Sequence, residues 1–184
     1  MSETTYIALL RGINVGGHNV KMEHLRSLFS EMGFGNVRSY IQSGNVFFDT
    51  AESDRAGLRT TIEQGLSDSL GYAVPACLRT LGEFESVLAR NPFEGIDVQP
   101  DMRLSVTFFA EPVSAELPVP FRTPDGAYEV VERTPSEVFV VWYLQNGRPG
   151  NSYGLIEKKL GVPGTTRFWH TSAKILAAAK GSAK

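Results

Sequence analysis

Two kinds of apolar repeat alternate along the first 80 residues, and this alternation restricts the possible folds more than any other feature. Short apolar runs typical of strands occupy residues 5–10, 37–41, 46–49 and 74–80. Between them, apolar residues recur at helical spacing in two segments, and Gly33 and Gly71 follow those segments as stop residues. The predicted order is therefore strand, helix, strand, strand, helix, strand.

That order is the ferredoxin-like plan, so we predict a ferredoxin-like βαββαβ subdomain over residues 1–81. Residues 82–184 predict a second, smaller α+β subdomain that ends in a helix. Its expected strands are 102–109, 128–132 and 137–143, and its expected helix starts are the Thr80–Glu83 capping box, Asn151 or Ser152, and Thr171 or Ser172. The prolines of 110–125 predict an irregular connection. The fold class is thus α+β.

The predicted topology brings distant segments together. The first two strands of such a sheet run in the same direction, so the loop after the first strand and the hairpin after the second lie at one edge. We therefore expect residues 11–19, 42–45 and 71–72 to converge, although they are far apart in the sequence.

The loop between the first strand and the first helix is the main candidate site. Free backbone N–H groups at a helix start favour anions, and glycine lets a backbone approach a ligand closely. The loop carries three glycines and three basic side chains but matches neither a Walker A loop nor Gly-x-Gly-x-x-Gly. A strained turn without a ligand explains it equally well. The candidate residues here are Arg11, Gly12, Asn14, Gly16, Gly17, His18 and Lys21.

Two further polar segments are candidates, each with a structural alternative. Gln42, Ser43 and Asn45 could hydrogen-bond a ligand held by the glycine loop, or they could simply form a hairpin turn. Arg167 could bind a phosphate or carboxylate with two parallel hydrogen bonds, with Lys174 close by in the final helix. The alternative for this last segment is a helix cap and a packed tryptophan.

Charge and cysteine content narrow the classes of protein. The formal net charge is −2, but residues 1–144 hold 11 Lys and Arg against 19 Asp and Glu, whereas 145–184 hold 7 against 1. The basic end could bind an anion or form a solvated helix face. Cys77 is the only cysteine, so we expect a buried thiol, no internal disulfide and a cytoplasmic location. We see no signal peptide or membrane-spanning stretch.

The sequence defines no catalytic machinery. His18, His24 and His170 lack metal-ligand spacing, so we predict no metal site, and no Gly-x-Ser-x-Gly motif is present. His18 is the one general base that we can name as a candidate. Whether the chain is an enzyme, and which cofactor it would use, therefore stay open.

Two long motifs, residues 6–19 and 40–46, resemble the bacterial domain-of-unknown-function 1697 family. The resemblance continues through Val20-Lys-Met22, Asn91-Pro-Phe93 and Thr165-Thr-Arg167 with Thr171 and Lys174. It implies a ferredoxin-like subdomain followed by a second α+β part, and no established activity, substrate or cofactor. Members usually read Thr-Thr-Arg-Asn-x-Asn-Thr near the C-terminus, where this chain has Phe168 and His170 in place of the two asparagines.

Three functions are compatible with these features. The first is binding of a small anionic, phosphate- or nucleotide-like ligand at the glycine-rich loop. The second is a single-stranded RNA-binding module, which would need Tyr6 and Phe47 or Phe48 exposed on the sheet and a basic surface. The third is a protein-interaction scaffold without catalysis. The ligand, the oligomeric state and the orientation of the two halves are not predicted.

Overall fold

The chain forms two compact units, each built on an antiparallel sheet. The computed structural model describes residues 3–148 and 154–181. Met1–Ala89 together with Ala173–Lys184 make the first unit, and Arg90–Ser172 make the second. One sheet has four strands and the other five. The predicted α+β class is therefore confirmed.

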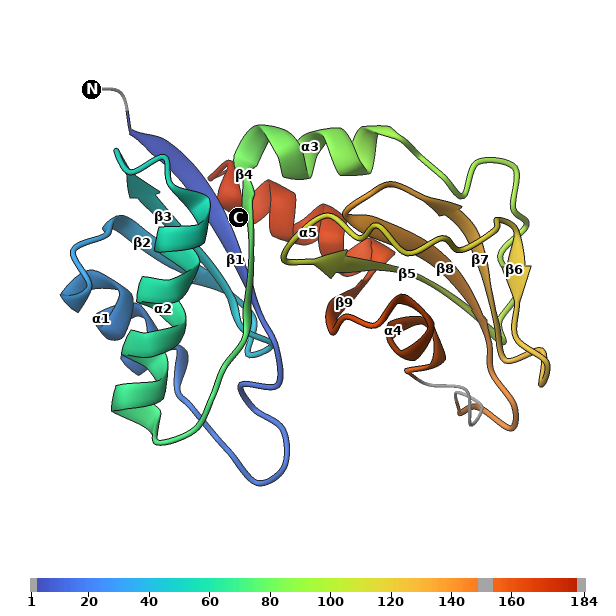
Figure 1. Cartoon of the computed structure of the whole chain (residues 1–184), viewed down its shortest axis with the longest axis horizontal. Helices are drawn as coiled ribbons and strands as arrows, with labels where there is room; N and C mark the ends of the chain where they lie inside the picture. The colour runs from blue at the N-terminus through green and yellow to red at the C-terminus, as the bar shows by residue number, and fades with distance from the viewer. Residues whose placement is uncertain (1–2, 149–153, 182–184) are drawn as a thin grey trace. The chain divides into compact units, whose positions relative to one another are not determined.

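The first unit contains the elements in the predicted βαββαβ order. Their bounds are β1 Thr4–Leu10, α1 Met22–Glu31, β2 Gly35–Tyr40, β3 Asn45–Thr50, α2 Arg55–Leu70 and β4 Ala76–Thr80, followed by α3 Leu81–Ala89. The sheet order is β2-β3-β1-β4, and all neighbouring strands are antiparallel. Helices α1 and α2 cover the same face of this sheet (Figure 1). Because β1 and β2 both pair antiparallel with β3, they run in the same direction, as predicted.

Helix α2 shows how local sequence produces these elements. Leu58, Ile62 and Leu66 recur every four residues and are all buried against the sheet. Asp54 begins the helix by accepting a 3.1 Å hydrogen bond from the Ala56 N–H. Gly71 ends it in the left-handed conformation, with φ of 80°, which glycine adopts without steric cost. The apolar periodicity and the residues at both ends therefore predict the same helix.

The C-terminal helix α5 spans Trp169–Ala179, and its residues from Ala173 onward belong to the first unit. The Arg38 guanidinium on β2 donates 3.1 Å hydrogen bonds to the carbonyls of Ala178 and Ala179. These carbonyls lie in the last turn, where a helix leaves acceptors unpaired and favours a cation. Lys180 also pairs with Glu85 of α3. The end of α5 is thus held by the Arg38 hydrogen bonds and by the Lys180–Glu85 ion pair.

The second unit has the sheet order β6-β7-β8-β5-β9. Its elements are β5 Met102–Phe109, β6 Phe121–Arg122, β7 Tyr128–Arg133, β8 Glu137–Tyr143, α4 Leu155–Leu160 and β9 Gly164–Phe168. Helix α4 packs Ile156 and Leu160 into an apolar core on the sheet. The Ile156 N–H donates to the Tyr128 hydroxyl at 3.2 Å. Burial raises the pKa of Tyr128 to about 12, so this phenol stays protonated.

Two features of the C-terminal part differ from the sequence expectation. Strand β9 was not predicted, because Gly164-Thr-Thr-Arg-Phe168 is polar and shows no apolar alternation. Helix α5 begins at Trp169 rather than at Thr171 or Ser172. The predicted caps Asn151 and Ser152 lie outside the described residues. Strands 102–109 and 137–143 have the predicted bounds. Among the described helices, none combines the length and apolarity needed to cross a membrane.

The predicted capping box at α3 is present and is joined to α2 by an ion pair. The Thr80 N–H donates to Glu83 at 2.9 Å, and the Glu83 N–H donates to the Thr80 hydroxyl at 3.2 Å. The Arg55 guanidinium donates to both carboxylate oxygens of Glu83, at 2.7 and 2.8 Å. Burial alone would raise the pKa of Glu83, but the hydrogen bonds from Arg55 and Thr80 lower it below 4.5.

We predict that this carboxylate makes folding stability depend on pH. A folded-state pKa below the unfolded value stabilises the protein above the unfolded pKa, and that contribution is lost as the pH falls through the folded pKa. Glu83→Gln should therefore destabilise the protein near neutral pH, by a modest amount because the pair is partly exposed. The difference should shrink as the pH falls below 4.5. Urea unfolding across this range measures it. A pH-independent difference, or an equal effect of Glu83→Gln in an Arg55→Gln background, would contradict this origin.

Candidate functional site

The glycine-rich loop between β1 and α1 is closed at its base by the side chain of Asn14. The Asn14 Oδ1 accepts a 2.6 Å hydrogen bond from the Val20 N–H, which returns the chain to the start of the loop. The Asn14 Nδ2 donates to the carbonyl of Gln42 at 2.7 Å and to that of Val20 at 3.4 Å. One amide therefore fixes both the loop and the β2–β3 hairpin.

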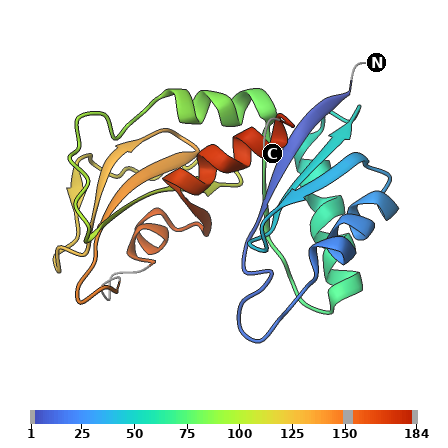
Figure 2. The ribbon, with the colours of Figure 1, turned by 180° about the vertical axis from the view of Figure 1, so that it is seen from behind.

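The predicted convergence of the three segments is confirmed by further hydrogen bonds. The Leu10 N–H donates to the Gly44 carbonyl at 2.8 Å, and the Tyr72 hydroxyl donates to the Ile13 carbonyl at 2.9 Å. Gly44 has φ of 78°, and a Cβ placed there would lie 2.8 Å from the Ile13 Cγ2. Only glycine fits this contact without movement. Figure 2 shows the loop and the hairpin at the same end of the sheet.

An open depression of about 550 Å³ lies beside this loop. Residues 17–21 form one wall, and His24 extends that wall along the first turn of α1. The end of α2 forms the other wall, through Ser69, Leu70 and Tyr72. The His18 ring stacks on Tyr72 with centroids 3.6 Å apart and planes inclined by 18°. None of the nine described residues lining the depression carries a carboxylate.

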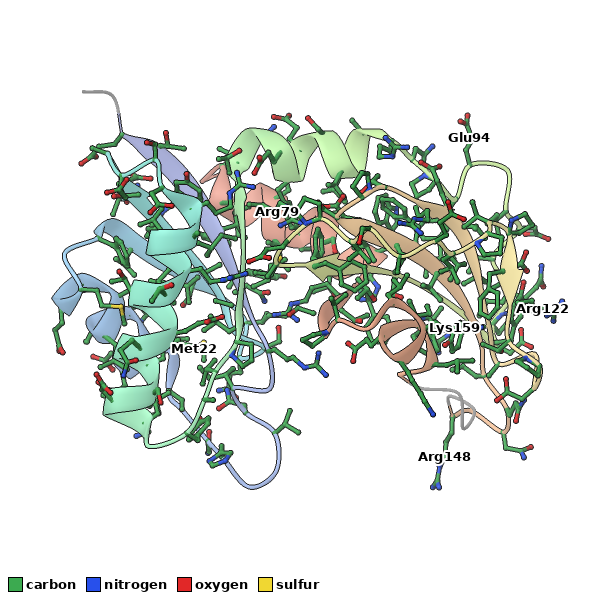
Figure 3. The ribbon with its side chains drawn as sticks, viewed as in Figure 1. Met22, Arg79, Glu94, Arg122, Arg148 and Lys159 are labelled. Carbon is green, nitrogen blue, oxygen red and sulfur yellow. The ribbon has the colours of Figure 1, made fainter. Side chains whose placement is uncertain are left out.

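The start of α1 adds to the positive character of this depression. Lys21 stands at the N-cap position in an extended conformation, with φ of −68° and ψ of 138°, and no side chain caps the helix. The first N–H groups of a helix lack intrahelical acceptors and carry partial positive charge. Met22, which begins the helix, is labelled in Figure 3. The Lys21 ammonium and the start of a helix therefore lie on the same wall.

Three of the predicted site residues, Gly17, His18 and Lys21, line the depression. Asn45 instead is fully buried, and its Nδ2 donates to the Tyr40 carbonyl at 3.0 Å and to the Ser43 hydroxyl at 2.9 Å. Like Asn14, it uses its amide within the protein. Gln42 is exposed and contributes its backbone carbonyl to the Asn14 contact.

The remaining predicted residues lie elsewhere. Gly12 and Gly16 are exposed in the loop, with φ of 68° and 69°, and Arg11 is half-buried at its start. Arg167 is buried on β9 of the second unit, where it donates to the Thr166 carbonyl at 2.9 Å. Lys174 is exposed on α5.

His24, Ser69, Leu70 and Tyr72 were not predicted as site residues. The sequence does offer a signal for His24. It lies three residues after Lys21, and residues at that spacing share a helix face. Residues 69–72 follow from the topology, since consecutive helices on one face of this sheet run in opposite directions. The start of α1 then lies near the end of α2. Residues 71–72 were expected at this edge of the sheet, whereas Ser69 and Leu70 were not.

The sheet aromatics are buried rather than available to bases. Tyr6 is 4% exposed and Phe47 is 1% exposed, and the Arg38 guanidinium lies 5.7 Å from the Phe47 ring centroid. Tyr6 and Phe48 belong to the core beneath α1 and α2. A ring must be exposed to stack on a base, so these residues give no support to the RNA-binding alternative. Cys77 is buried, as expected.

A second cavity, in the second unit, is too small for a metabolite. It has a volume of about 30 Å³, and Thr107, Tyr128 and Glu157 are among its lining residues. Such a volume holds water-sized molecules. Among the described residues, no group of three or more His, Cys, Asp or Glu side chains could hold a metal ion. The depression beside the glycine-rich loop is therefore the candidate site.

These observations define a class of protein. It is an α+β protein with two antiparallel sheets and a glycine-rich loop at the edge of the first sheet. The family model described as protein of unknown function (DUF1697) matches residues 3–139. The chain belongs to that family.

One solved structure is similar to this chain over nearly its full length. The structure of the conserved bacterial protein SP0830 from Streptococcus pneumoniae matches with a TM-score of 0.69 and 26% sequence identity, covering 97% of this chain and 99% of that one. No curated protein gives a significant match. Neither the family nor this neighbour is described by an activity, so the function is argued from the site itself.

We predict that Asn14→Ala destabilises the protein by ~1–3 kcal/mol, because the N–H of Val20, a buried residue, loses its acceptor. Denaturant unfolding measures the loss, and amide hydrogen exchange at Val20 should accelerate. Asn19→Ala is the matched control, since Asn19 is exposed in the same loop, and it should stay within about 0.5 kcal/mol of the parent. Equal stability of the Asn14→Ala protein and the parent would show that the amide does not hold the loop.

Proposed function

We propose that this protein binds a small anionic ligand, phosphate-like in charge, in the depression between the glycine-rich loop and the end of α2. The observation that carries the proposal is the composition of the lining. Lys21, His18 and His24 contribute basic side chains, and the described lining residues include no carboxylate. The uncapped start of α1 adds N–H donors beside Lys21.

The geometry of the loop supports a site that exists before the ligand arrives. Its base is closed by the Asn14 hydrogen bonds, whereas residues 15–19 are exposed. A loop with a fixed base loses less conformational entropy when it binds a ligand than a free loop does. The volume of about 550 Å³ also lies within the usual range for small-molecule sites. The site is therefore sized for a metabolite rather than for a bare ion.

The chemistry of the site supports binding and defines no reaction. Lys21 and the first N–H groups of α1 neutralise and hydrogen-bond an anion. His18 is held against Tyr72, whose hydroxyl is already donated to the Ile13 carbonyl. Burial raises the pKa of Tyr72, so the phenol stays neutral and keeps this hydrogen bond. The Tyr72 contact thus positions the loop.

We predict saturable binding of inorganic phosphate, measured by isothermal titration calorimetry at low ionic strength. Lys21→Gln should weaken it about tenfold, which corresponds to the loss of one charge-assisted hydrogen bond. Binding should also weaken as salt is added, because the depression is open to solvent.

Lys158→Gln is the control for Lys21→Gln, because Lys158 is equally exposed but lies on α4 of the second unit. It should leave the phosphate affinity unchanged. Absence of saturable binding to the parent protein would overturn the proposal. Equal weakening by Lys158→Gln and Lys21→Gln would overturn the location of the site.

A further inference from the structure

We infer that residues 15–19 form a movable flap at the rim of the depression, and that the ring of His18 latches this flap closed by stacking on Tyr72. Three residues of the flap, Gly17, His18 and Asn19, line the depression. Movement of the flap therefore changes one of its walls. The flap controls access to the site in the proposed function, and to that extent the inference rests on that proposal.

The flap lies between two fixed points. Asn14 precedes it and is held by the 2.7 Å hydrogen bond from its Nδ2 to the Gln42 carbonyl. Val20 follows it, is buried, and donates its N–H to the Asn14 Oδ1 at 2.6 Å. Because one side chain holds both ends, residues 15–19 can move without disturbing β1 or α1.

Between these points the flap makes few stabilising contacts. All five of its residues are exposed. Its hydrogen bonds are the Val15 N–H to the Gly12 carbonyl at 3.3 Å and the His18 N–H to the Val15 carbonyl at 3.4 Å, both longer than most N–H···O bonds. Within the part of the chain that the structure describes, no hydrogen bond joins residues 15–19 to a residue outside the loop. Exposed hydrogen bonds and little buried contact mark a segment of low local stability.

Two adjacent glycines give the flap its hinge. Gly16 and Gly17 have φ of 69° and 91°, and a Cβ at either position would meet nothing within 4 Å. Glycine is therefore needed there for its backbone conformation and not for lack of space. Hinges are often built from such small residues, because they absorb large changes in φ and ψ.

The latch has a fixed half and a movable half. The Tyr72 hydroxyl donates to the Ile13 carbonyl at 2.9 Å, which holds the ring at the base of the loop. The His18 ring, on the flap, stacks on it with centroids 3.6 Å apart and planes inclined by 18°. Aromatic pairs of this kind shift an equilibrium about twofold to tenfold. A latch of that strength keeps the flap mostly closed and still lets it open.

NMR spectroscopy of the ligand-free full chain tests the latch. We expect the His18 ring protons to be shifted upfield by the ring current of Tyr72, and Tyr72→Phe, which removes only the hydroxyl, to keep this shift. Tyr72→Leu should abolish the shift. Both Tyr72→Leu and His18→Ala should lower the backbone order parameters of residues 15–19 from about 0.85 toward about 0.6. His24→Ala is the matched control, because His24 is an exposed imidazole on the same wall, and it should leave them unchanged. Order parameters that stay at the parent value in both His18→Ala and Tyr72→Leu would overturn the inference.

Calorimetry with inorganic phosphate separates the latch from the proposed function. Tyr72→Leu keeps every basic side chain of the lining, so its phosphate affinity should fall about twofold to tenfold only because the closed flap is less populated. An unchanged affinity together with a disordered flap would show that the flap does not control the site. If the NMR results hold and the parent binds no phosphate, the proposed function fails and the latch stands. If phosphate binds and the order parameters do not change, the latch fails and the proposed function stands.

Discussion

The hydrogen bonds of one side-chain amide, that of Asn14, determine the geometry on which the candidate site depends. The amide accepts from the Val20 N–H and donates to the Gln42 carbonyl, so it closes the glycine-rich loop and ties it to the β2–β3 hairpin. Lys21 follows Val20 directly, and α1 begins at the next residue. The Asn14 hydrogen bond to Val20 therefore both closes the loop and fixes the point at which the chain enters α1. Apolar side chains at this position could not replace both contacts.

The two walls of the depression follow from topology, whereas the preference for anions that we propose rests on its side chains. In a βαββαβ unit the two helices run in opposite directions on one face of the sheet, which brings a helix start beside a helix end. That pairing alone offers donors on one side and acceptors on the other. In the proposed function, the basic side chains of Lys21 and His24 add to the helix start.

Most of the first unit could be predicted from its sequence because several local patterns agree. Apolar residues at i+4 in α2, the Asp54 cap and Gly71 all indicate the same helix, and the order of elements then predicts which loops meet. Strand β9 could not be predicted from its sequence. Thr165 and Arg167 are polar, which does not indicate burial, but they are buried where β9 pairs with β5. The roles of Asn14 and Asn45 were equally inaccessible. An amide that holds a loop and an amide that contacts a ligand look alike in a sequence, and only the positions of the surrounding backbone groups distinguish them.

The surface around the loop agrees with the small ligand that we propose and gives no support to the scaffold alternative. Protein interfaces need a contiguous apolar centre with a polar rim. Among the described residues of the loop and the hairpin, the exposed large apolar side chains are Val15 and Ile41, which are 68% and 46% exposed. Ile41 also adopts a φ of 49°, which is costly for a β-branched residue. Two such side chains cannot exclude water from an interface of ordinary size. The depression next to them, whose described lining residues carry no carboxylate, suits the polar ligand that we propose for it, because charge and hydrogen bonding would hold such a ligand.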